Sequence, residues 1–177
     1  MVKAIVTDAT STMGGRLIKL LTETEGIELY GVVASPDSPA IGRDAGEYHR
    51  IGSLGVLIAA DLRDVIRNSC VVVDFSEKDL ALLNLAIAAE HKTSVVMGTM
   101  GFMLDEMEQI RELTKKTRCV LVPNVNPALF AEKGAGLELI YRSFIRDTFA
   151  REAIAAAKWI VKQKNGLYDM QDVLGLK

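Results

Sequence analysis

Short apolar runs alternate along the chain with segments whose apolar residues recur at helical spacing. The runs are rich in Val and Ile and are apolar on both faces, which is typical of strands in a parallel sheet that is covered on both sides. They occupy residues 3–7, 27–34, 55–59, 70–75, 94–99 and 119–124. This alternation predicts an α/β fold, a Rossmann-like doubly wound parallel sheet with right-handed crossovers.

The segments between the runs carry apolar stripes three or four residues apart, which predict amphipathic helices. Ser76, with Asp79 three residues later, predicts the capped start of the second of these helices. The three stripes are Met13, Leu17, Leu20 and Leu21; Leu80, Leu83 and Ile87; and Met107, Ile110 and Leu113.

The pattern changes after about residue 127. Residues 137–144 alternate weakly and predict one more strand, and 146–164 predict a helix that returns to the sheet. Asp147 is expected to cap the start of this helix and Gly166 its end. Its buried face is predicted to hold Phe149, Ala153, Ala157 and Ile160. We therefore divide the chain into a Rossmann-like dinucleotide-binding-type domain (1–127), a connection (128–146), and a C-terminal helix with a tail that packs on the first domain (147–177).

Composition and charge exclude several classes of function. Apolar residues make up 49% of the chain and charged residues 25%, and the net charge is −2. This balance gives no electrostatic reason to expect nucleic acid or an anionic membrane as a partner. The chain enters its first strand without a leader, so we expect a cytoplasmic protein in which Cys70 and Cys119 are reduced thiols. His49 and His91 have no second ligand at metal spacing, so no metal site is predicted.

The turn after the first strand is the first candidate site. A pyrophosphate binds there when glycines allow its close approach to a helix N-terminus. In this chain the turn has Asp8 and Ser11, and of the glycines that a phosphate-binding turn uses only Gly14 is present. Two readings stay open: Asp8, Thr10 and Ser11 cap the helix themselves, or a weakened phosphate site is retained.

Three further motifs carry a resemblance. Asp74-Phe75-Ser76 ends the fourth run, residues 98–102 read Gly-Thr-Met-Gly-Phe, and Pro123-Asn124 ends the sixth. With residues 42–47 and the tail from Phe149 to Leu176, they resemble the 4-hydroxy-tetrahydrodipicolinate reductase (dihydrodipicolinate reductase) family. The resemblance implies NAD(P)H-dependent reduction in diaminopimelate and lysine synthesis. It also implies cofactor-binding residues at Ser11, Thr12, Met13, Gly14, Ser35, Phe75, Gly98, Thr99, Gly101, Pro123 and Asn124.

The chain departs from the family at both ends of the expected site. The family has Gly-x-x-Gly-Arg-Met-Gly in the first turn, where this chain has residues 8–14. Met100 replaces a Thr and Asn126 a Ser. The family's substrate domain, with its His-His pair, Lys and Ser-Gly-Thr segment, is reduced to the residues between Asn126 and Tyr141, and 137–144 resemble its last strand. We therefore assign no catalytic residue.

Other residues near the expected site have open interpretations. Residues 35–54, with two prolines and three glycines, predict a loop at the adenosine end of the site. Within it, Asp37 either bonds ribose hydroxyls or is solvated, and Arg43 either meets a 2′-phosphate or is solvated. Phe75 and Phe102 either flank a ring or pack on the sheet. Gly98 and Gly101 suit either a ligand or a turn with positive φ, and Lys133, Arg142, Arg146 and Arg151 are expected to be solvated.

Two classes of function follow. The first is a reductase-like protein that is inactive on its own and acts as a degenerate Rossmann binding or oligomerisation module, with weak or lost NAD(P)H binding. The second is an NAD(P)H-dependent reductase completed by another subunit, or a truncated reductase. We expect a homo-oligomer, or a complex with a full-length reductase. Its contact surfaces are predicted on the Ala-rich face of 150–161 and on 137–144.

Overall fold

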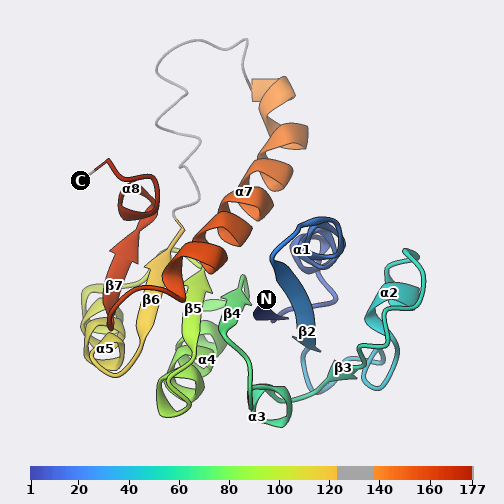
Figure 1. Cartoon of the computed structure of the whole chain (residues 1–177), viewed down its shortest axis with the longest axis horizontal. Coiled ribbons are helices and arrows are strands. Elements are labelled where there is room, and N and C mark those ends of the chain that lie inside the picture. The colour runs from blue at the N-terminus through green and yellow to red at the C-terminus, as the bar shows by residue number, and fades with distance from the viewer. Residues whose placement is uncertain (123–137, 177) are drawn as a thin grey trace.

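A seven-stranded parallel sheet forms the centre of the molecule (Figure 1). The computed structural model describes residues 1–122 and 138–176, with the side chains of 138–146 left undescribed. Every neighbouring pair of strands is parallel, and the order reverses between β1 and β4, as in doubly wound folds. In spatial order the strands are β3 (Ile58–Ala59), β2 (Ile27–Val33), β1 (Val2–Val6), β4 (Val71–Asp74), β5 (Ser94–Met97), β6 (Arg118–Leu121) and β7 (Gly166–Asp169).

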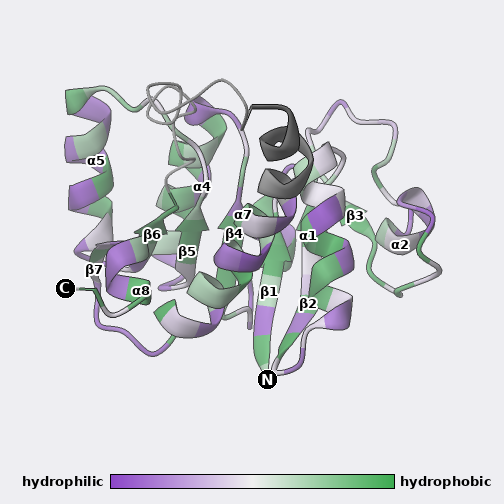
Figure 2. Cartoon of the chain, turned by 90° about the horizontal axis from the view of Figure 1, so that it is seen from above, coloured by the Kyte–Doolittle hydropathy of each residue, from purple (hydrophilic) through white to green (hydrophobic). Residues whose placement is uncertain are grey.

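Helices cover both faces of the sheet, so its strands are apolar on both sides (Figure 2). One face packs against α1 (Thr12–Glu23) and α7 (Glu138–Ile160), which lie side by side. The other face packs against α3 (Leu62–Val65), α4 (Lys78–Glu90) and α5 (Leu104–Thr114). No helix in the described part of the chain is both long and apolar enough to cross a membrane.

The predicted helical stripe is confirmed in α1, whereas in α4 only Ile87 of the three predicted residues is buried. Leu17, Leu20 and Leu21 are buried in the core, as the spacing indicates. Leu80 and Leu83 are 39% and 47% exposed, and Ile87 is buried together with Ala81, Leu85 and Ala88. Since α4 is apolar on nearly every side, its spacing allows two stripes, and only the sheet decides which one is buried.

The start of α4 also differs from the prediction. Its N-cap is Glu77, which makes no side-chain capping bond. The Ser76 hydroxyl donates to Asp74 instead. A buried carboxylate therefore holds the Ser76 hydroxyl that the sequence assigned to the helix.

The predicted strand at 137–144 is wrong, because residues 138–144 lie in α7. No Gly or Pro interrupts 138–160, so a helix extends through the segment once it has begun. Asp147 therefore lies inside α7 and does not cap its start. Gly166 does not cap its end either, because α7 ends at Ile160 and Gly166 begins β7. The predicted buried face is confirmed, since Phe149, Ala153, Ala157 and Ile160 are all buried.

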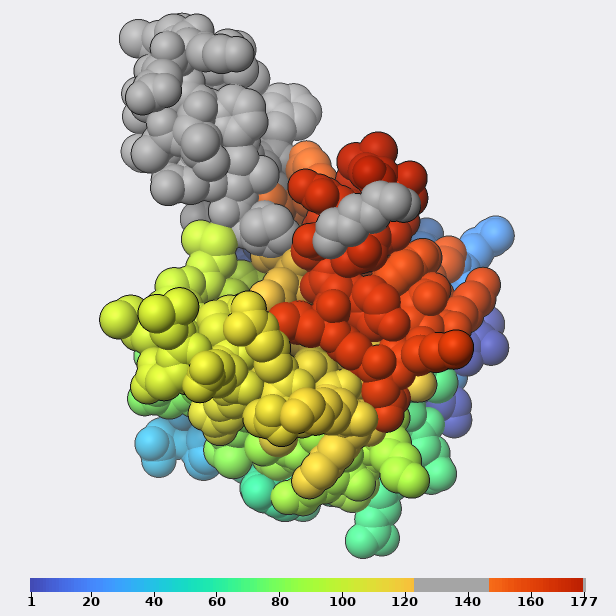
Figure 3. Space-filling view, turned by 90° about the vertical axis from the view of Figure 1, so that its left-hand side faces the viewer, coloured from blue at the N-terminus to red at the C-terminus, as the bar shows by residue number. Residues whose placement is uncertain are grey.

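The predicted tail completes the sheet. β7 pairs with β6 from Arg118 to Leu121, and α8 (Met170–Val173) follows it. In Figure 3, these C-terminal residues (red) lie beside α5 and β6 (yellow). Trp159 of α7 meets Tyr168 of β7 edge to face, with ring centroids 5.3 Å apart. The sequence predicts that residues 147–177 pack on the first domain, but it does not predict that they contain the strand β7.

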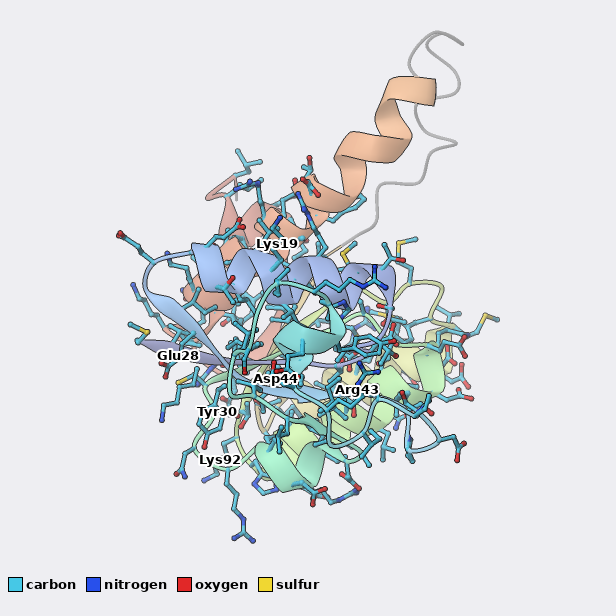
Figure 4. All side chains as sticks on the ribbon, turned by 90° about the vertical axis from the view of Figure 1, so that its right-hand side faces the viewer. Lys19, Glu28, Tyr30, Arg43, Asp44 and Lys92 are labelled. Atoms are coloured by element: carbon cyan, nitrogen blue, oxygen red, sulfur yellow. The ribbon has the colours of Figure 1, made fainter. Side chains whose placement is uncertain are left out.

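The loop between β2 and β3 contains a short helix, α2 (Ala45–Tyr48), and is organised by Asp44 (Figure 4). The Asp44 carboxylate accepts hydrogen bonds from the amides of Gly46, Glu47, Leu54 and Gly55. These amides lower the pKa of Asp44 to about 2, with the bond from Glu47 contributing most. The stretch from Gly46 to Gly55 is therefore held by one carboxylate. Ser35 and Pro36 lie at the start of the loop, just after the carboxyl end of β2.

Candidate functional site

A cleft of about 800 Å³ opens at the carboxyl ends of β1, β4 and β5, where the strand order reverses. Open α/β sheets bind their ligands at this position. Three of the predicted site residues, Ser35, Phe75 and Thr99, line it together. The remaining lining residues are Asp8, Ser76, Glu77, Lys78, Asp79, Leu80 and Met100.

The turn between β1 and α1 (residues 7–14, the β1 turn) forms one wall of the cleft. Ser11 is the N-cap of α1, and its hydroxyl accepts a hydrogen bond of 3.0 Å from the Gly14 amide. Asp8 has a φ of +53°, a conformation that Asn and Asp tolerate better than most residues. Of the predicted capping residues, Ser11 is confirmed, whereas the Asp8 backbone carbonyl only accepts from the Ser11 amide.

The Asp8 carboxylate lies in an unfavourable environment for a charge. Burial raises the pKa of Asp8 above its ordinary value, and the carboxylates of Asp74 and Glu77 raise it further. A hydrogen bond from the Ser11 side chain acts in the opposite direction. The β1 turn thus presents a partly buried carboxylate where a phosphate-binding turn presents only amides.

Gly14 is retained for a packing reason. A Cβ at this position would lie 2.3 Å from the carbonyl oxygen of Asp8, which is backbone and cannot easily move away. The glycine lets α1 pack closely on the turn, as the third glycine of a dinucleotide fingerprint does. The turn has kept the glycine that the fold needs.

A hydrogen-bonded network forms the opposite wall, at residues 74–76 and 98–101 (the β4–β5 edge). The carboxylate of Asp74 is fully buried and accepts from the Ser76 amide at 2.8 Å, the Ser76 hydroxyl, and the Asn84 side chain at 2.7 Å. Thr99 donates to the Ser76 carbonyl at 2.6 Å. These bonds fix the loop that carries Phe75 into the cleft, and sequence reasoning had not linked Asn84 to it.

Glycines at this edge serve different purposes. Gly101 has a φ of +80°, as predicted. Gly98 does not have a positive φ, so that part of the prediction is wrong. A Cβ on Gly98 would lie 2.1 Å from the Phe75 ring, and close packing of this ring explains the glycine. Phe75 thus packs at the top of the sheet and also lines the cleft.

Ser11 and Thr12 line a second cavity of about 510 Å³ on the outer side of α1. Arg16, the cation nearest the turn in sequence, lies in this cavity and forms an ion pair with Asp147 of α7. The His49 imidazole, at the end of α2, lies 2.7 Å from the Ala9 carbonyl oxygen. The turn's residues therefore divide between two cavities, and Arg16 is engaged away from the main cleft.

Several predicted positions lie elsewhere or outside the described residues. Arg43 lies over the Tyr48 ring at 5.2 Å, on the loop side of the molecule (Figure 4), and Asp37 is exposed. Met13 packs against the core. Pro123 and Asn124 lie outside the described residues, as do Lys133 and the side chains of Arg142 and Arg146. Arg151 is exposed.

The Ala-rich face of 150–161 is not available to a partner. Ala150, Ala153, Ala156 and Ala157 are fully buried within this chain, in the core cluster that also holds residues of α1. The prediction that this face forms a dimer contact is therefore wrong.

The described residues contain no cluster of His, Cys, Asp and Glu that could hold a metal ion. Both cysteines are free thiols, with Cys119 buried and Cys70 partly exposed, and burial raises the pKa of the Cys119 thiol. These thiols lie outside the lining of the cleft.

The chain matches two family models. The model described as "Dihydrodipicolinate reductase, N-terminus" matches residues 2–125, and the one described as "Dihydrodipicolinate reductase, C-terminus" matches residues 82–174. The 4-hydroxy-tetrahydrodipicolinate reductase of Syntrophus aciditrophicus is 31% identical over 267 residues, an alignment that covers 100% of both proteins. That of Syntrophotalea carbinolica is 27% identical over the same length. Since the alignments are longer than this chain of 177 residues, both relatives contain residues without a counterpart here.

Solved structures share the fold. A dipicolinate-bound dihydrodipicolinate reductase from Paenisporosarcina sp. TG-14 superposes with a TM-score of 0.57 at 18% identity, covering 70% of this chain and 48% of that one. An amine dehydrogenase from Mycobacterium smegmatis gives a TM-score of 0.60 at 22% identity, covering 76% and 44%. The chain thus spans less than half the length of these two solved proteins.

Proposed function

This chain belongs to the dihydrodipicolinate reductase family, and from that premise we propose that it is a binding module of the family that holds NAD(P)H weakly and performs no reduction on its own. The family reaction is the NAD(P)H-dependent reduction in lysine biosynthesis. The observation that supports weak binding most directly is the Asp8 carboxylate in the lining of the cleft. A pyrophosphate in the β1 turn would meet this charge.

The residues present do not fit a pyrophosphate. At a separation of ~4 Å, two like charges repel by about 1 kcal/mol in water and by about 4 kcal/mol at an effective dielectric of 20. The repulsion lowers affinity by roughly fivefold or more. The Gly14 amide already donates its hydrogen bond to the Ser11 hydroxyl, and Arg16 forms an ion pair with Asp147. The turn therefore supplies no cation to offset Asp8.

The second part of the proposal, that the chain performs no reduction on its own, is supported by the residues that its relatives have and it does not. A hydride transfer needs substrate held at reacting distance and an acid that delivers the accompanying proton. The relatives contain residues that this chain lacks, and we place that loss at 128–146, where the family has its substrate domain. A homo-oligomer or a complex with a full-length reductase remains part of this proposal.

Titration calorimetry with NADH and NADPH tests the proposal. We expect no binding in the micromolar range for the natural chain. Asp8→Gly is expected to raise affinity at least fivefold, because it removes the charge and suits the positive φ of the turn. Glu90→Gln, which removes a charge at the far end of α4, is the matched control. Micromolar binding by the natural chain would contradict the proposal.

The β4–β5 edge favours a second function, because the hydrogen bonds of Asp74 and Thr99 hold its loops in place beside the cleft. In this alternative, another subunit supplies the substrate groups and the pair forms an active reductase. Mixing the chain with a full-length reductase and following NADH oxidation separates the two functions. A rate above that of the full-length enzyme alone supports the alternative, and an unchanged rate supports the binding module.

A further inference from the structure

Asp8 is a charged residue on the wall of the main cleft against which a pyrophosphate would lie. Its side chain lines the cleft and also an adjoining cavity of about 100 Å³. The residue is only partly buried, so protons from the solvent can reach its carboxylate. A ligand in the β1 turn therefore lies beside a group that can change its charge.

The charged groups around Asp8 leave its negative charge uncompensated. The carboxylates of Asp74 and Glu77, at the end of β4 and the start of α4, act on it and raise its pKa. Asp79 adds a further carboxylate to the cleft, and the loop after β2 contributes only uncharged residues such as Ser35. Among the described residues, the two cations of these linings are each ion-paired, and so is Arg16 of α1; the pairs are Lys78–Glu106, Arg63–Asp61 and Arg16–Asp147.

A phosphate that approaches the ionised Asp8 has two possible consequences. Either the two negative charges repel, which at ~4 Å and an effective dielectric of 20 lowers affinity roughly a thousandfold, or Asp8 takes up a proton. For a carboxyl with a pKa of about 4, proton uptake lowers affinity about tenfold at pH 5 and about ten-thousandfold at pH 8. Burial and the neighbouring carboxylates raise the pKa of Asp8, which reduces both factors. Proton uptake is therefore favoured over repulsion in mildly acidic solution and loses that advantage in alkaline solution.

We propose that the dinucleotide site of this chain is gated by a proton, which Asp8 takes up from the solvent when a pyrophosphate enters the β1 turn. This inference rests on the proposed function, because it attributes the weak binding of NAD(P)H near neutral pH to the ionised Asp8. The neutral carboxyl no longer repels the phosphates, and its O–H can donate a hydrogen bond to a phosphate oxygen. Binding is therefore tighter where the proton is available, in mildly acidic solution.

The affinity for NAD⁺ as a function of pH, measured by titration calorimetry, tests this coupling. NAD⁺ carries the same pyrophosphate as NADH and is stable in acid. Between about pH 8 and about pH 5, we expect the affinity of the natural chain to rise by up to tenfold for each unit that the pH falls. Asp8→Asn is neutral throughout this range, so its affinity should not depend on pH and should exceed that of the natural chain at the alkaline end. Glu90→Gln, at the far end of α4, leaves Asp8 in place and should keep the pH dependence.

The proton itself can be counted by calorimetry in two buffers of different ionisation enthalpy at the same pH. The measured binding enthalpy then differs between the buffers in proportion to the number of protons taken up. For the natural chain and for Glu90→Gln we expect an uptake that approaches one proton per NAD⁺ at pH values between the pKa of Asp8 in the free chain and its pKa in the complex. Asp8→Asn should take up none. A merely structural role of Asp8 would produce no difference between the buffers.

The possible outcomes separate this inference from the proposed function. An affinity that is independent of pH overturns the inference, and so does a pH dependence that persists unchanged in Asp8→Asn. A failure of NAD⁺ to bind at millimolar concentration at every pH also overturns it. All three results leave the weak binding of the proposed function intact. Micromolar binding of NADH near neutral pH contradicts the proposed function, whereas proton uptake by Asp8 in the same chain would still support the inference.

Discussion

The two walls of the cleft differ in what they have kept. The β4–β5 edge has a buried carboxylate with three hydrogen-bond donors, a close contact between Gly98 and Phe75, and a left-handed Gly101. The β1 turn has a partly buried carboxylate whose pKa is raised and a serine that caps its own helix. Both walls retain the glycine that close packing requires. Only the β1 turn has a carboxylate and a capping serine where a dinucleotide fingerprint has glycines.

The difference shows which contacts hold the fold and which serve a ligand. Asp74 and Asp8 are both carboxylates at strand ends, but Asp74 accepts from groups of its own chain, whereas Asp8 gains little from its neighbours. Removing the Asp74 carboxylate should therefore lower the free energy of unfolding, whereas removing the Asp8 carboxylate should mainly change which ligands bind. The predictions below test this contrast from the largest expected effect to the smallest.

The same substitution at the two aspartates gives the largest contrast. Asp74→Asn turns an amide toward the donors of Ser76 or Asn84, and we expect the free energy of unfolding to fall by about 3 kcal/mol. Asp8→Asn should change it by less than about 0.5 kcal/mol at neutral pH, because Asn accepts a positive φ. Urea denaturation measures both. Equal losses would mean that the two walls do not differ in this way.

Gly14 tests whether the β1 turn has kept its packing role. Gly14→Ala sets a Cβ against the backbone oxygen of Asp8, and we expect a loss of about 2 kcal/mol in the free energy of unfolding. Gly98→Ala is the matched change at the other wall. It should cost about half as much, because the Phe75 side chain can rotate into the open cleft. A neutral Gly14→Ala would show that the close approach of α1 is dispensable.

Capping by Ser11 is the next smaller effect. Ser11→Ala removes the acceptor of the Gly14 amide and should lower the free energy of unfolding by about 1 kcal/mol, whereas Ser11→Gly should cost a few tenths. Thr12→Ala, at the neighbouring exposed position, is the control and is expected to be near neutral. Thermal and urea unfolding both report the change. If Ser11→Ala is neutral, the side chain is free to make room for a ligand.

Most of the fold could be predicted because its signals are local. The stripe of α1 and the buried face of α7 follow from periodicity along the chain and are confirmed. Each of the six predicted runs contains a strand, although the strand in 55–59 is only Ile58–Ala59. The start of α7 and the edge strand β7 could not be predicted. Residues 138–144 and 166–169 are short segments, and whether each becomes helix or strand depends on neighbours distant in sequence. The exposed Leu80 and Leu83 follow the same rule, since the sheet alone decides which side of α4 is buried.

The site was predictable in position but not in charge. Motifs placed Phe75 and Thr99 at one edge, and the N-cap role of Ser11 followed from its residue type. The sequence analysis does not predict Glu77 and Asp79 as cleft residues, although Glu77 is the N-cap of α4 and Asp79 lies in its first turn, at the edge where parallel strands deliver side chains. The ion pair between Arg16 and Asp147 depends on a tertiary contact, which no local pattern contains.

The smallest expected effect is a pH dependence whose sign differs between two aspartates. The folded-state pKa of Asp8 is raised, so its ionised form destabilises the fold, and this penalty disappears as pH falls through that pKa. The pKa of Asp44 is lowered from 3.8 to about 2, so its contribution to the stability of the fold is present above its unfolded pKa and is lost as pH falls toward 2.

Relative to the natural chain, Asp8→Asn should therefore be slightly more stable near neutral pH and Asp44→Asn less stable. Urea unfolding between pH 7 and about pH 2 should show the two differences shrinking from opposite sides. A difference of the same sign for both variants would mean that the Asp8 carboxylate is stabilised in the turn, and the contrast between the walls of the cleft would then lose its electrostatic basis.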